Sequence, residues 1–200
     1  MANWCNVRLS VFGTPTELKP FREAAGALDG RIDTTRSSIF LEEMEIGEGA
    51  DLEARGVRSF HRRFQRAEYI FQGRNTDHLD HFIKVSKRYP RLAFVVTYSD
   101  PNGDDHGSHL VVKGRSRSWV VSGRRRESIV RAAYREHGCV DKQGRIDYDH
   151  DYSDVADWAA FSEMMRVASV KWNGSVLEIL QRQAPPAGFK KRATSRRTRR

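Results

Sequence analysis

Residues 4–13 read WCNVRLSVFG, and this stretch decides the fold. Apolar side chains occupy the odd positions from Cys5 to Val11, while polar side chains occupy the even positions from Asn6 to Ser10. A period of two over this length predicts a β-strand that buries one face. We expect Cys5 to be a small core residue, because nothing near it in sequence would activate its thiol or complete a metal site.

The face opposite Cys5 carries Trp4 together with the even-numbered polar residues. In split βαβ domains that bind RNA, this face stacks bases on aromatic side chains. The glycine and aromatic signature of those domains is absent from Arg66–Gly73. Packing of Trp4 on a C-terminal extension is therefore the simpler expectation.

Capping and turn residues divide the rest of the chain into strands and helices. Thr14 and Glu17 form a capping-box pattern with Pro15 between them, which predicts a helix whose apolar stripe ends near Leu28. Strands are expected at Ser38–Gly47, Ala67–Gly73, Leu92–Tyr98, His109–Gly114 and Ser118–Ser122, with a loop over 47–58, and helices at Thr76–Arg88, Arg124–His137 and Asp154–Ala168. Residues 169–180 fit either a hairpin on an Asn173-Gly174 turn or a short helix that starts at Ser175.

The order of these elements predicts an α+β fold. Strand, helix, strand, strand, helix, strand is the split βαβ pattern of ferredoxin-like domains, an antiparallel sheet with helices on one face. This domain is expected over residues 1–122, and a mainly helical extension at 123–183 packs on it. Residues 184–200 form a basic tail whose composition predicts disorder.

The opening Asn3-Trp4-Cys5-Asn6 with its alternating strand resembles the YubB-type ferredoxin-like domain family, whose members are proteins of plasmids and phages. A second match runs from Tyr69 to Gly107, and together the two cover roughly the first 120 residues. The family often carries a tryptophan- and glycine-rich stretch before its third strand, where residues 56–67 here hold no tryptophan. The resemblance implies the fold and a mobile-element context, but no catalytic residues.

The net charge of +9 is concentrated at the C-terminus. Seven of the 35 Lys and Arg residues lie in 185–200, which holds no acidic residue, so the remaining chain balances 28 basic against 26 acidic side chains. The chain has no apolar run long enough for a membrane span and no signal-peptide pattern. Its two cysteines are too few for a disulfide framework. We expect a protein of the reducing cytoplasm with no membrane partner.

Arginine clusters and the tail are the candidate nucleic-acid contacts. Arg124–Arg126 begin a predicted helix, where positive charges are unfavourable because they oppose the helix dipole. Arginines placed there despite this energetic cost indicate a possible use of their charges in binding an anion. A disordered basic arm binds polyanions without sequence preference and with strong salt dependence, although a solubilising tail is the simpler alternative. The expected nucleic-acid-binding residues are Arg62, Arg63, Arg66, Arg115, Arg117, Arg124, Arg125, Arg126, Lys190, Lys191, Arg192, Arg196 and Arg197.

Two histidine pairs and one acidic stretch permit a metal-site hypothesis. His78 and His81 lie on one predicted helix, with His81 on its solvent face, and His106 and His109 are expected around a turn rich in Asp and Gly. The aspartates of residues 147–154 alternate as in an extended cation-binding segment, but they also suit a helix N-terminus or the neutralisation of an arginine cluster. We predict no metal, no cofactor and no catalytic residue.

Three functions follow from these features. The chain holds no phosphate-cradling glycine loop, nucleophile elbow or paired catalytic motif, so an enzyme is the minority hypothesis. The leading hypothesis is a cytoplasmic, non-enzymatic accessory protein of a mobile element that binds DNA or RNA, or a nucleoprotein. The alternatives are a protein-interaction module that inhibits a host defence complex, and a divalent-metal phosphodiesterase that uses the Asp147–Asp151 stretch or the histidine pairs.

Overall fold

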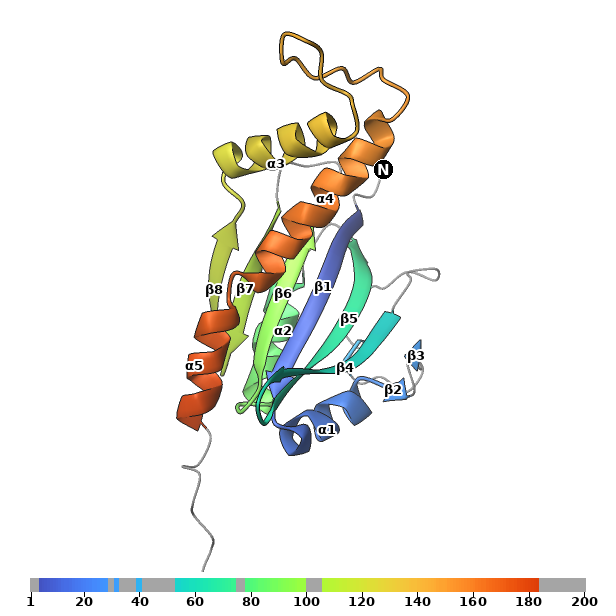
Figure 1. Ribbon diagram of the computed structural model, residues 1–200. Coiled ribbons are helices and arrows are strands. Elements are labelled where there is room, and N and C mark those ends of the chain that lie inside the picture. Colours follow the sequence, from blue (N-terminus) through green and yellow to red (C-terminus); the bar gives the residue numbers. More distant parts are fainter. Residues whose placement is uncertain are drawn as a thin grey trace, which may run out of the picture.

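A six-stranded antiparallel sheet forms the body of the protein (Figure 1). The computed structural model describes residues 4–28, 31–32, 39–40, 53–74, 78–99 and 106–183. The elements are β1 (Trp4–Gly13), α1 (Pro15–Ala24), β2 (Ala27–Leu28), β3 (Arg31–Ile32), β4 (Glu53–His61), β5 (Phe64–Arg74), α2 (Leu79–Arg88), β6 (Ala93–Ser99), β7 (His106–Val112), β8 (Arg115–Val120), α3 (Gly123–Glu136), α4 (Ser153–Val170) and α5 (Asn173–Gln183). The sheet has the order β4-β5-β1-β6-β7-β8, and β2 pairs separately with β3. The chain is α+β, as the sequence predicts.

β1 is a central strand, as its alternating pattern predicts. It pairs antiparallel with β5 along its whole length and with β6 from Asn6 to Phe12. Val7 and Leu9 are fully buried, and Cys5 belongs to the same core as apolar side chains of α1 and α2. The odd-numbered side of β1 therefore faces these two helices.

α1 begins with the predicted capping box. The Thr14 hydroxyl accepts a hydrogen bond from the Glu17 backbone N–H at 3.3 Å, and Glu17 Oε2 accepts one from the Thr14 N–H at 3.0 Å. This reciprocal pair satisfies two donors that the first turn of a helix leaves unpaired. Leu18 and Phe21 then pack into the core beneath the sheet, which fixes the helix against it.

Helices cover both faces of the sheet: α1 and α2 lie on one face, and α4 and α5, from the predicted helical extension, lie on the other. In Figure 1, α2 lies behind the sheet, whereas α4 and α5 lie in front of β6, β7 and β8. A second core forms there, in which Val95 of β6 and Leu110 of β7 contact Trp172 and the apolar side of α5. β6 and β7 are buried on nearly every residue, as expected for strands enclosed between two layers.

The strand that pairs with β5 on the outer side lies elsewhere than predicted. Apart from residues 39–40, the expected strand at Ser38–Gly47 lies outside the described residues, whereas residues 53–58, expected as a loop, belong to β4. β4 is an edge strand with mostly exposed side chains, so no apolar alternation marks it in the sequence. A register shift around Gly56, whose φ is +78°, further interrupts the alternation of inward and outward side chains along β4.

β7 and β8 extend the sheet beyond β6, so the strand order differs from that of a four-stranded ferredoxin-like sheet. The two strands form a tight hairpin at Lys113 and Gly114, whose φ values of 52° and 76° are typical of a type I′ turn. The Gly114 N–H donates to the Ser86 hydroxyl of α2 at 2.8 Å, which ties this hairpin to the first helix layer. The predicted pair of further strands is present, with the turn nearer the N-terminus than expected.

The C-terminal helices α3 and α4 lie within two residues of their predicted positions. Ser122 caps α3, because its hydroxyl accepts a hydrogen bond from the Arg125 N–H at 3.4 Å. α3 packs on α4 through a small core that includes Ile129 and Met164. α5 begins at Asn173, so the helix alternative for this segment is correct and the hairpin alternative is wrong.

One buried hydroxyl fastens the junction of α4 and α5 to the sheet. Ser108 of β7 is fully buried, its Oγ donates to the Ala168 carbonyl at 2.9 Å, and it accepts a hydrogen bond from Trp172 Nε1 at 2.9 Å. Ala168 lies in the last turn of α4, and Trp172 directly precedes α5. A single side chain therefore positions both helices on the second face.

We predict that Ser108→Ala lowers the free energy of unfolding by about 1–3 kcal/mol, because the buried Trp172 N–H loses its acceptor. Ser116→Ala, on an exposed position of the neighbouring strand β8, is the matched control and should change the free energy of unfolding by no more than about 0.5 kcal/mol. Urea unfolding followed by circular dichroism measures both. Equal midpoints for the two variants would contradict the role of Ser108.

Candidate functional site

The predicted arginine clusters of the folded part lie toward opposite sides of the sheet. Arg62 and Arg63 form the turn between β4 and β5, and Arg66 lies on β5, whereas Arg115 and Arg117 lie on β8. Four strand spacings separate β5 from β8, a distance of about 19 Å across the sheet. These two clusters therefore do not form one patch.

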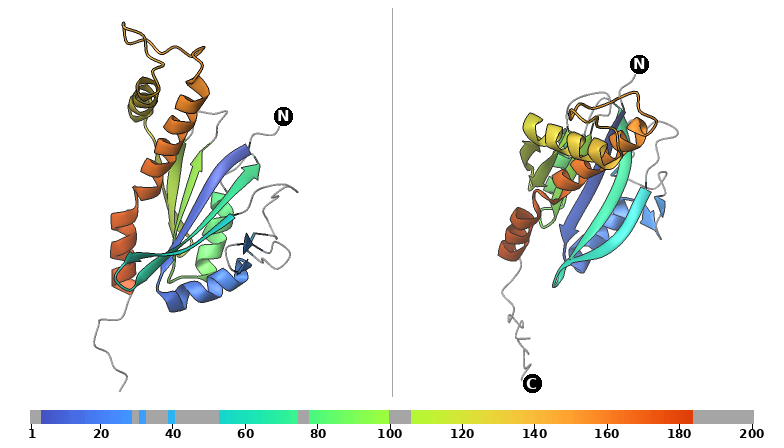
Figure 2. Two further views of the ribbon diagram at one scale, coloured as in Figure 1. Left: turned by 45° about the vertical axis from the view of Figure 1, so that its right-hand side comes forward. Right: turned by 45° about the horizontal axis from the view of Figure 1, so that its top comes forward.

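The tip of the β4–β5 hairpin lies against α5 (Figure 2). Phe60 and Phe64 flank the turn arginines and share a core with Leu180 of α5. The Arg63 guanidinium lies 5.4 Å from the centroid of the Phe64 ring, within the range of a cation–π contact. The basic turn thus lies beside the helix that ends at Gln183, after which the tail follows. The tail candidates Lys190, Lys191, Arg192, Arg196 and Arg197 lie outside the described residues.

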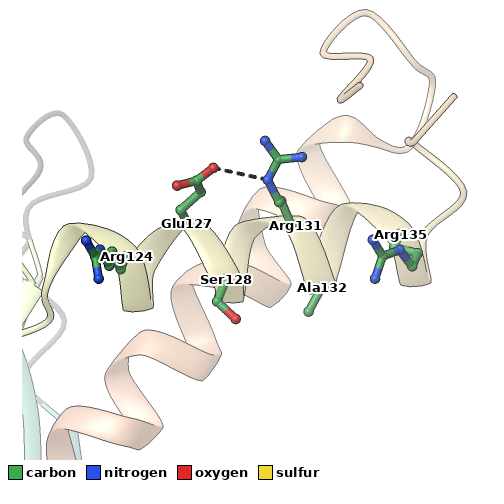
Figure 3. A pocket seen from close by; sticks show the side chains of 6 residues that line it. All are labelled: Arg124, Glu127, Ser128, Arg131, Ala132 and Arg135. Atoms are coloured by element: carbon green, nitrogen blue, oxygen red, sulfur yellow. Dashed lines mark hydrogen bonds and ion pairs between the residues drawn. The ribbon is translucent and has the colours of Figure 1, made fainter. Parts of the chain in front are cut away.

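α3 carries an exposed basic stripe, which we define as Arg124, Arg131 and Arg135 (Figure 3). Ser128 and Ala132 lie between these arginines, so small side chains leave the guanidinium groups free of bulky neighbours along the helix. The helix holds five arginines and two glutamates. The α3 stripe is therefore a positively charged surface on a regular, well-packed element.

The members of the α3 stripe differ in their contacts. Arg131 Nε donates to Glu127 Oε1 at 3.2 Å, and Arg131 Nη1 donates to the Gly144 carbonyl at 3.2 Å. Arg124 and Arg135 form no ion pair with any residue in the described ranges. The stripe spans about 16 Å of helix. One strand of a nucleic-acid duplex presents about five phosphates over that length.

Arg125 and Arg126 do not belong to the stripe. Arg125 lines the groove between α3 and α4, where it lies near Glu163. Hydrogen bonds from Arg166 hold the pKa of Glu163 below its usual value, and Arg125 adds to this effect. Arg126 is half-buried. Of the three arginines predicted as contacts at the start of α3, the structure therefore places one on the exposed stripe.

A second basic group lies on the sheet itself, and of its members only Arg66 was predicted as a nucleic-acid contact. Arg8 of β1, Arg55 of β4 and Arg66 of β5 interact electrostatically around Glu68. Arg66 Nη2 lies 3.4 Å from Glu68 Oε2. Burial lowers the pKa of Arg8, Glu68 opposes that shift, and Arg55 and Arg66 reinforce it. The sequence feature that points to this group is Arg8, an arginine in the middle of a central strand.

The histidine pair of α2 is buried among aromatic rings. His81 is 7% exposed and its ring centroid lies 5.3 Å from that of Phe82, so the expected solvent position of His81 is wrong. His78 precedes the helix, and its ring centroid lies 5.9 Å from that of Phe71. The helix turns its histidine side toward the core because its apolar stripe is broader than the sequence pattern indicated.

The second histidine pair lies within β7 rather than around a turn. His106 contacts the Ser99 hydroxyl, whereas His109 contacts the Ser118 hydroxyl at 2.8 Å and stacks on Tyr98. Residues three apart on a strand point to opposite faces, so these two side chains cannot share a ligand. Among the described residues, no group of three or more His, Cys, Asp or Glu side chains is arranged to hold a metal ion.

The acidic stretch 147–154 lies before and at the start of α4, beside exposed apolar side chains. Tyr148, Tyr152 and Trp158 are 66%, 59% and 67% exposed, and Val155 is 48% exposed. We name these four residues the aromatic patch. Aspartates alternate with them along the chain, so the patch carries negative charge at the end of the molecule where α3 carries positive charge.

Comparisons with known proteins return no relative. No family model, no curated protein and no solved structure matches the chain. The YubB-type resemblance therefore stays a prediction. No helix within the described ranges is long and apolar enough to cross a membrane.

We predict that Glu127→Gln strengthens polyanion binding by the α3 stripe, because it removes the carboxylate that lies among the three arginines. The variant should elute from a heparin column at a higher salt concentration than the wild type. Glu178→Gln, on the exposed side of α5, changes the net charge equally and is the matched control. Identical elution of the two variants would show that net charge, and not the stripe, determines binding.

Proposed function

We propose that this chain is a non-enzymatic protein that binds DNA, RNA or a nucleoprotein. The observation that carries the proposal is the α3 stripe, in which Arg124 and Arg135 have no acidic partner in the described part of the chain. Arginine side chains on a rigid helix bind backbone phosphates, which gives affinity without sequence readout. α3 is suited to this role because its packing on α4 leaves the arginines on the outer side.

The turn of the β4–β5 hairpin, which lies at the end of the molecule away from α3, supports the same proposal, and so does the charge of the tail sequence. Arg62 and Arg63 lie beside the last helix, and the seven cations of residues 185–200 follow it in the chain. A basic arm would add non-specific, salt-sensitive affinity to the contacts of the folded part. The protein would then act as an accessory factor that holds a nucleic acid, with no chemical step of its own.

We also infer a split βαβ arrangement for the first six principal elements. Their chain order is β1, α1, β4, β5, α2, β6, and β5 lies between β4 and β1 in the sheet, which supports this inference. Membership of the YubB-type family and a plasmid or phage context rest on the N-terminal motif at residues 3–6 and the second match at 69–107. Both cysteines are free and buried, which suits a reducing cytoplasm.

The variant Arg124→Gln/Arg131→Gln/Arg135→Gln tests the proposal. We expect it to bind duplex DNA more weakly than the wild type, and the slope of log affinity against log salt to fall by about 0.9 for each phosphate that the variant no longer binds. Fluorescence anisotropy with labelled duplex DNA, single-stranded DNA and RNA, between about 50 and 200 mM salt, measures both quantities. Removal of residues 185–200 should flatten the slope further.

The matched control is Arg145→Gln/Arg166→Gln/Arg182→Gln, which removes the same charge from arginines that are each paired with a carboxylate. This control should retain most of the wild-type affinity. Equal reductions of affinity in the two triple variants would show that binding follows net charge alone. A wild-type protein that binds none of the three nucleic acids at about 50 mM salt would refute the proposed function.

A protein-interaction module is the second candidate function, and the aromatic patch favours it. Exposed tryptophan and tyrosine side chains are enriched in the energetically dominant parts of protein interfaces. Trp158 rests edge-on against Phe161 at 5.7 Å, so its ring is supported from one side while two thirds of it remain exposed. The partner in this case would be a host complex, and the basic tail would be dispensable.

We predict that Trp158→Ala abolishes capture of a protein partner from nuclease-treated host lysate, if the second function holds. Val170→Ala, which shortens another exposed apolar side chain at the far end of α4, should leave capture unchanged. Mass spectrometry of the captured material identifies the partner. Capture that disappears on nuclease treatment, or that needs residues 185–200, would instead support the nucleic-acid function.

A further inference from the structure

The aromatic patch offers four accessible apolar side chains before and at the start of α4. Each member is between 48% and 67% exposed: Tyr148, Tyr152, Val155 and Trp158. Neighbouring apolar side chains that stay in solvent mark interaction sites, whereas single ones are ordinary on a protein surface. The Tyr148 ring lies edge-on to the buried Tyr134 ring, with the two centroids 5.4 Å apart. The patch is therefore an accessible apolar surface on a packed support.

Carboxylates surround the patch, and no cation of the described residues neutralises them. Residues 147–158 hold five aspartates and neither lysine nor arginine. All five aspartates are exposed: Asp147, Asp149, Asp151, Asp154 and Asp157. The nearest arginines in the chain, Arg145 and Arg166, are paired with Asp141 and Glu163 instead. The patch therefore combines exposed rings with an excess of negative charge.

Rings beside carboxylates are the groups that bind arginine and lysine. A guanidinium stacks on the face of an indole or phenol ring, and its N–H donors can pair with a carboxylate at the same time. Trp158 and the two tyrosines supply the rings, and the aspartates at alternate positions from 147 to 151 supply carboxylates. The chemistry of the patch therefore selects a basic peptide segment and repels a polyanion.

Residues 185–200 are the segment of this chain that matches the patch in charge. They carry seven cations and no acidic residue, whereas the rest of the chain is nearly balanced in charge. A second acidic stretch, residues 42–53, holds six acidic residues but no aromatic side chain, so it offers no ring on which a guanidinium can stack. Charge and stacking together therefore favour the patch as the partner of the basic segment.

Distance along the molecule favours the basic segment of a second copy over that of the same chain. α5 continues from α4 away from the patch (Figure 1). The 18 residues of α4 and the 11 residues of α5 together span about 40 Å. An extended chain that turns back from Gln183 needs about 12 residues to cover that distance. In the same chain, Lys190–Arg192 would lie between α5 and the patch, whereas all seven cations of a second copy can dock.

We propose that the aromatic patch of one chain binds the basic segment 185–200 of a second copy. The contact is heterologous, because it leaves a free patch on one chain and a free basic segment on the other, and association continues until a ring closes. It names a partner for the patch other than a host complex. The inference does not rest on the proposed nucleic-acid function, which uses the α3 stripe.

Sedimentation velocity of the nuclease-treated full chain at low salt tests the proposal. The mass of the wild type should rise with concentration, and added salt should weaken the association. The patch variant, Asp149→Asn/Asp151→Asn/Trp158→Ala, removes two carboxylates and the most exposed ring, so we expect it to weaken the contact by about tenfold or more. In the tail variant, glutamine replaces all seven Lys and Arg residues of 185–200, and we expect a loss of similar size.

A mixture of the two variants gives the sharpest result. The patch variant keeps an intact basic segment, and the tail variant keeps an intact patch. Each variant alone should stay monomeric. Their equimolar mixture should form a heterodimer and nothing larger, because only one of the two possible contacts between them is intact.

The matched control is Asp80→Asn/Val170→Ala/Glu178→Gln, which removes two exposed carboxylates and one exposed apolar side chain away from the patch. It should associate as the wild type does. Thermal unfolding of each variant establishes that the fold is intact.

Each outcome supports or overturns the proposal. A heterodimer in the mixture, with monomers in the separate variants, supports it. A wild type that stays monomeric overturns it, and so does association that either variant retains alone, because another surface then makes the contact. Association seen only before nuclease treatment overturns it in favour of a shared nucleic acid. Absence of DNA binding with self-association intact overturns the proposed function and leaves this contact standing.

Discussion

The hydroxyl of Ser108 holds the C-terminal helices on the sheet, and the division of the molecular surface depends on that contact. It binds the Ala168 carbonyl and the Trp172 indole at the point where α4 ends and α5 is about to begin. With the junction fixed, α4 and α5 close a second core over β6 and β7, and α4 supports α3. The cover leaves the polar side of β1 and β5 open, where Arg8 and Arg66 lie.

Local sequence patterns predicted the elements whose formation depends on near neighbours in the chain. The alternation in β1, the capping box of Thr14 and Glu17, and the apolar stripes of α3 and α4 each have a local physical cause. β4 was missed because an edge strand needs no buried face and its bulge interrupts the period. The helical extension was predicted, but not which strands it covers, because apolar residues on both sides of β6 do not reveal which segment packs on them.

The candidate site was predictable as a set of residues but not as an arrangement. The arginine positions could be read directly, yet their grouping depends on strand order, which separates Arg66 from Arg115 and leaves Arg125 in a groove. The histidine pair of β7 was misassigned because the strand already begins at His106. His106 and His109 therefore lie on opposite faces of the sheet. Arg8 is visible in the opening stretch, but its significance lies in its partial burial and in its interaction with Glu68, Arg55 and Arg66 of other strands. Neither property can be read from one sequence.

The central claim is that the α3 stripe contacts nucleic acid, whereas α4 and α5 close the second face of the sheet over β6 and β7. A two-dimensional amide NMR titration of the full chain with a short single-stranded DNA tests this division directly. We predict progressive shifts for the α3 stripe, while Leu110 and Val176 in the covered core stay in place. Shifts confined to the aromatic patch, or the absence of shifts along α3, would contradict it.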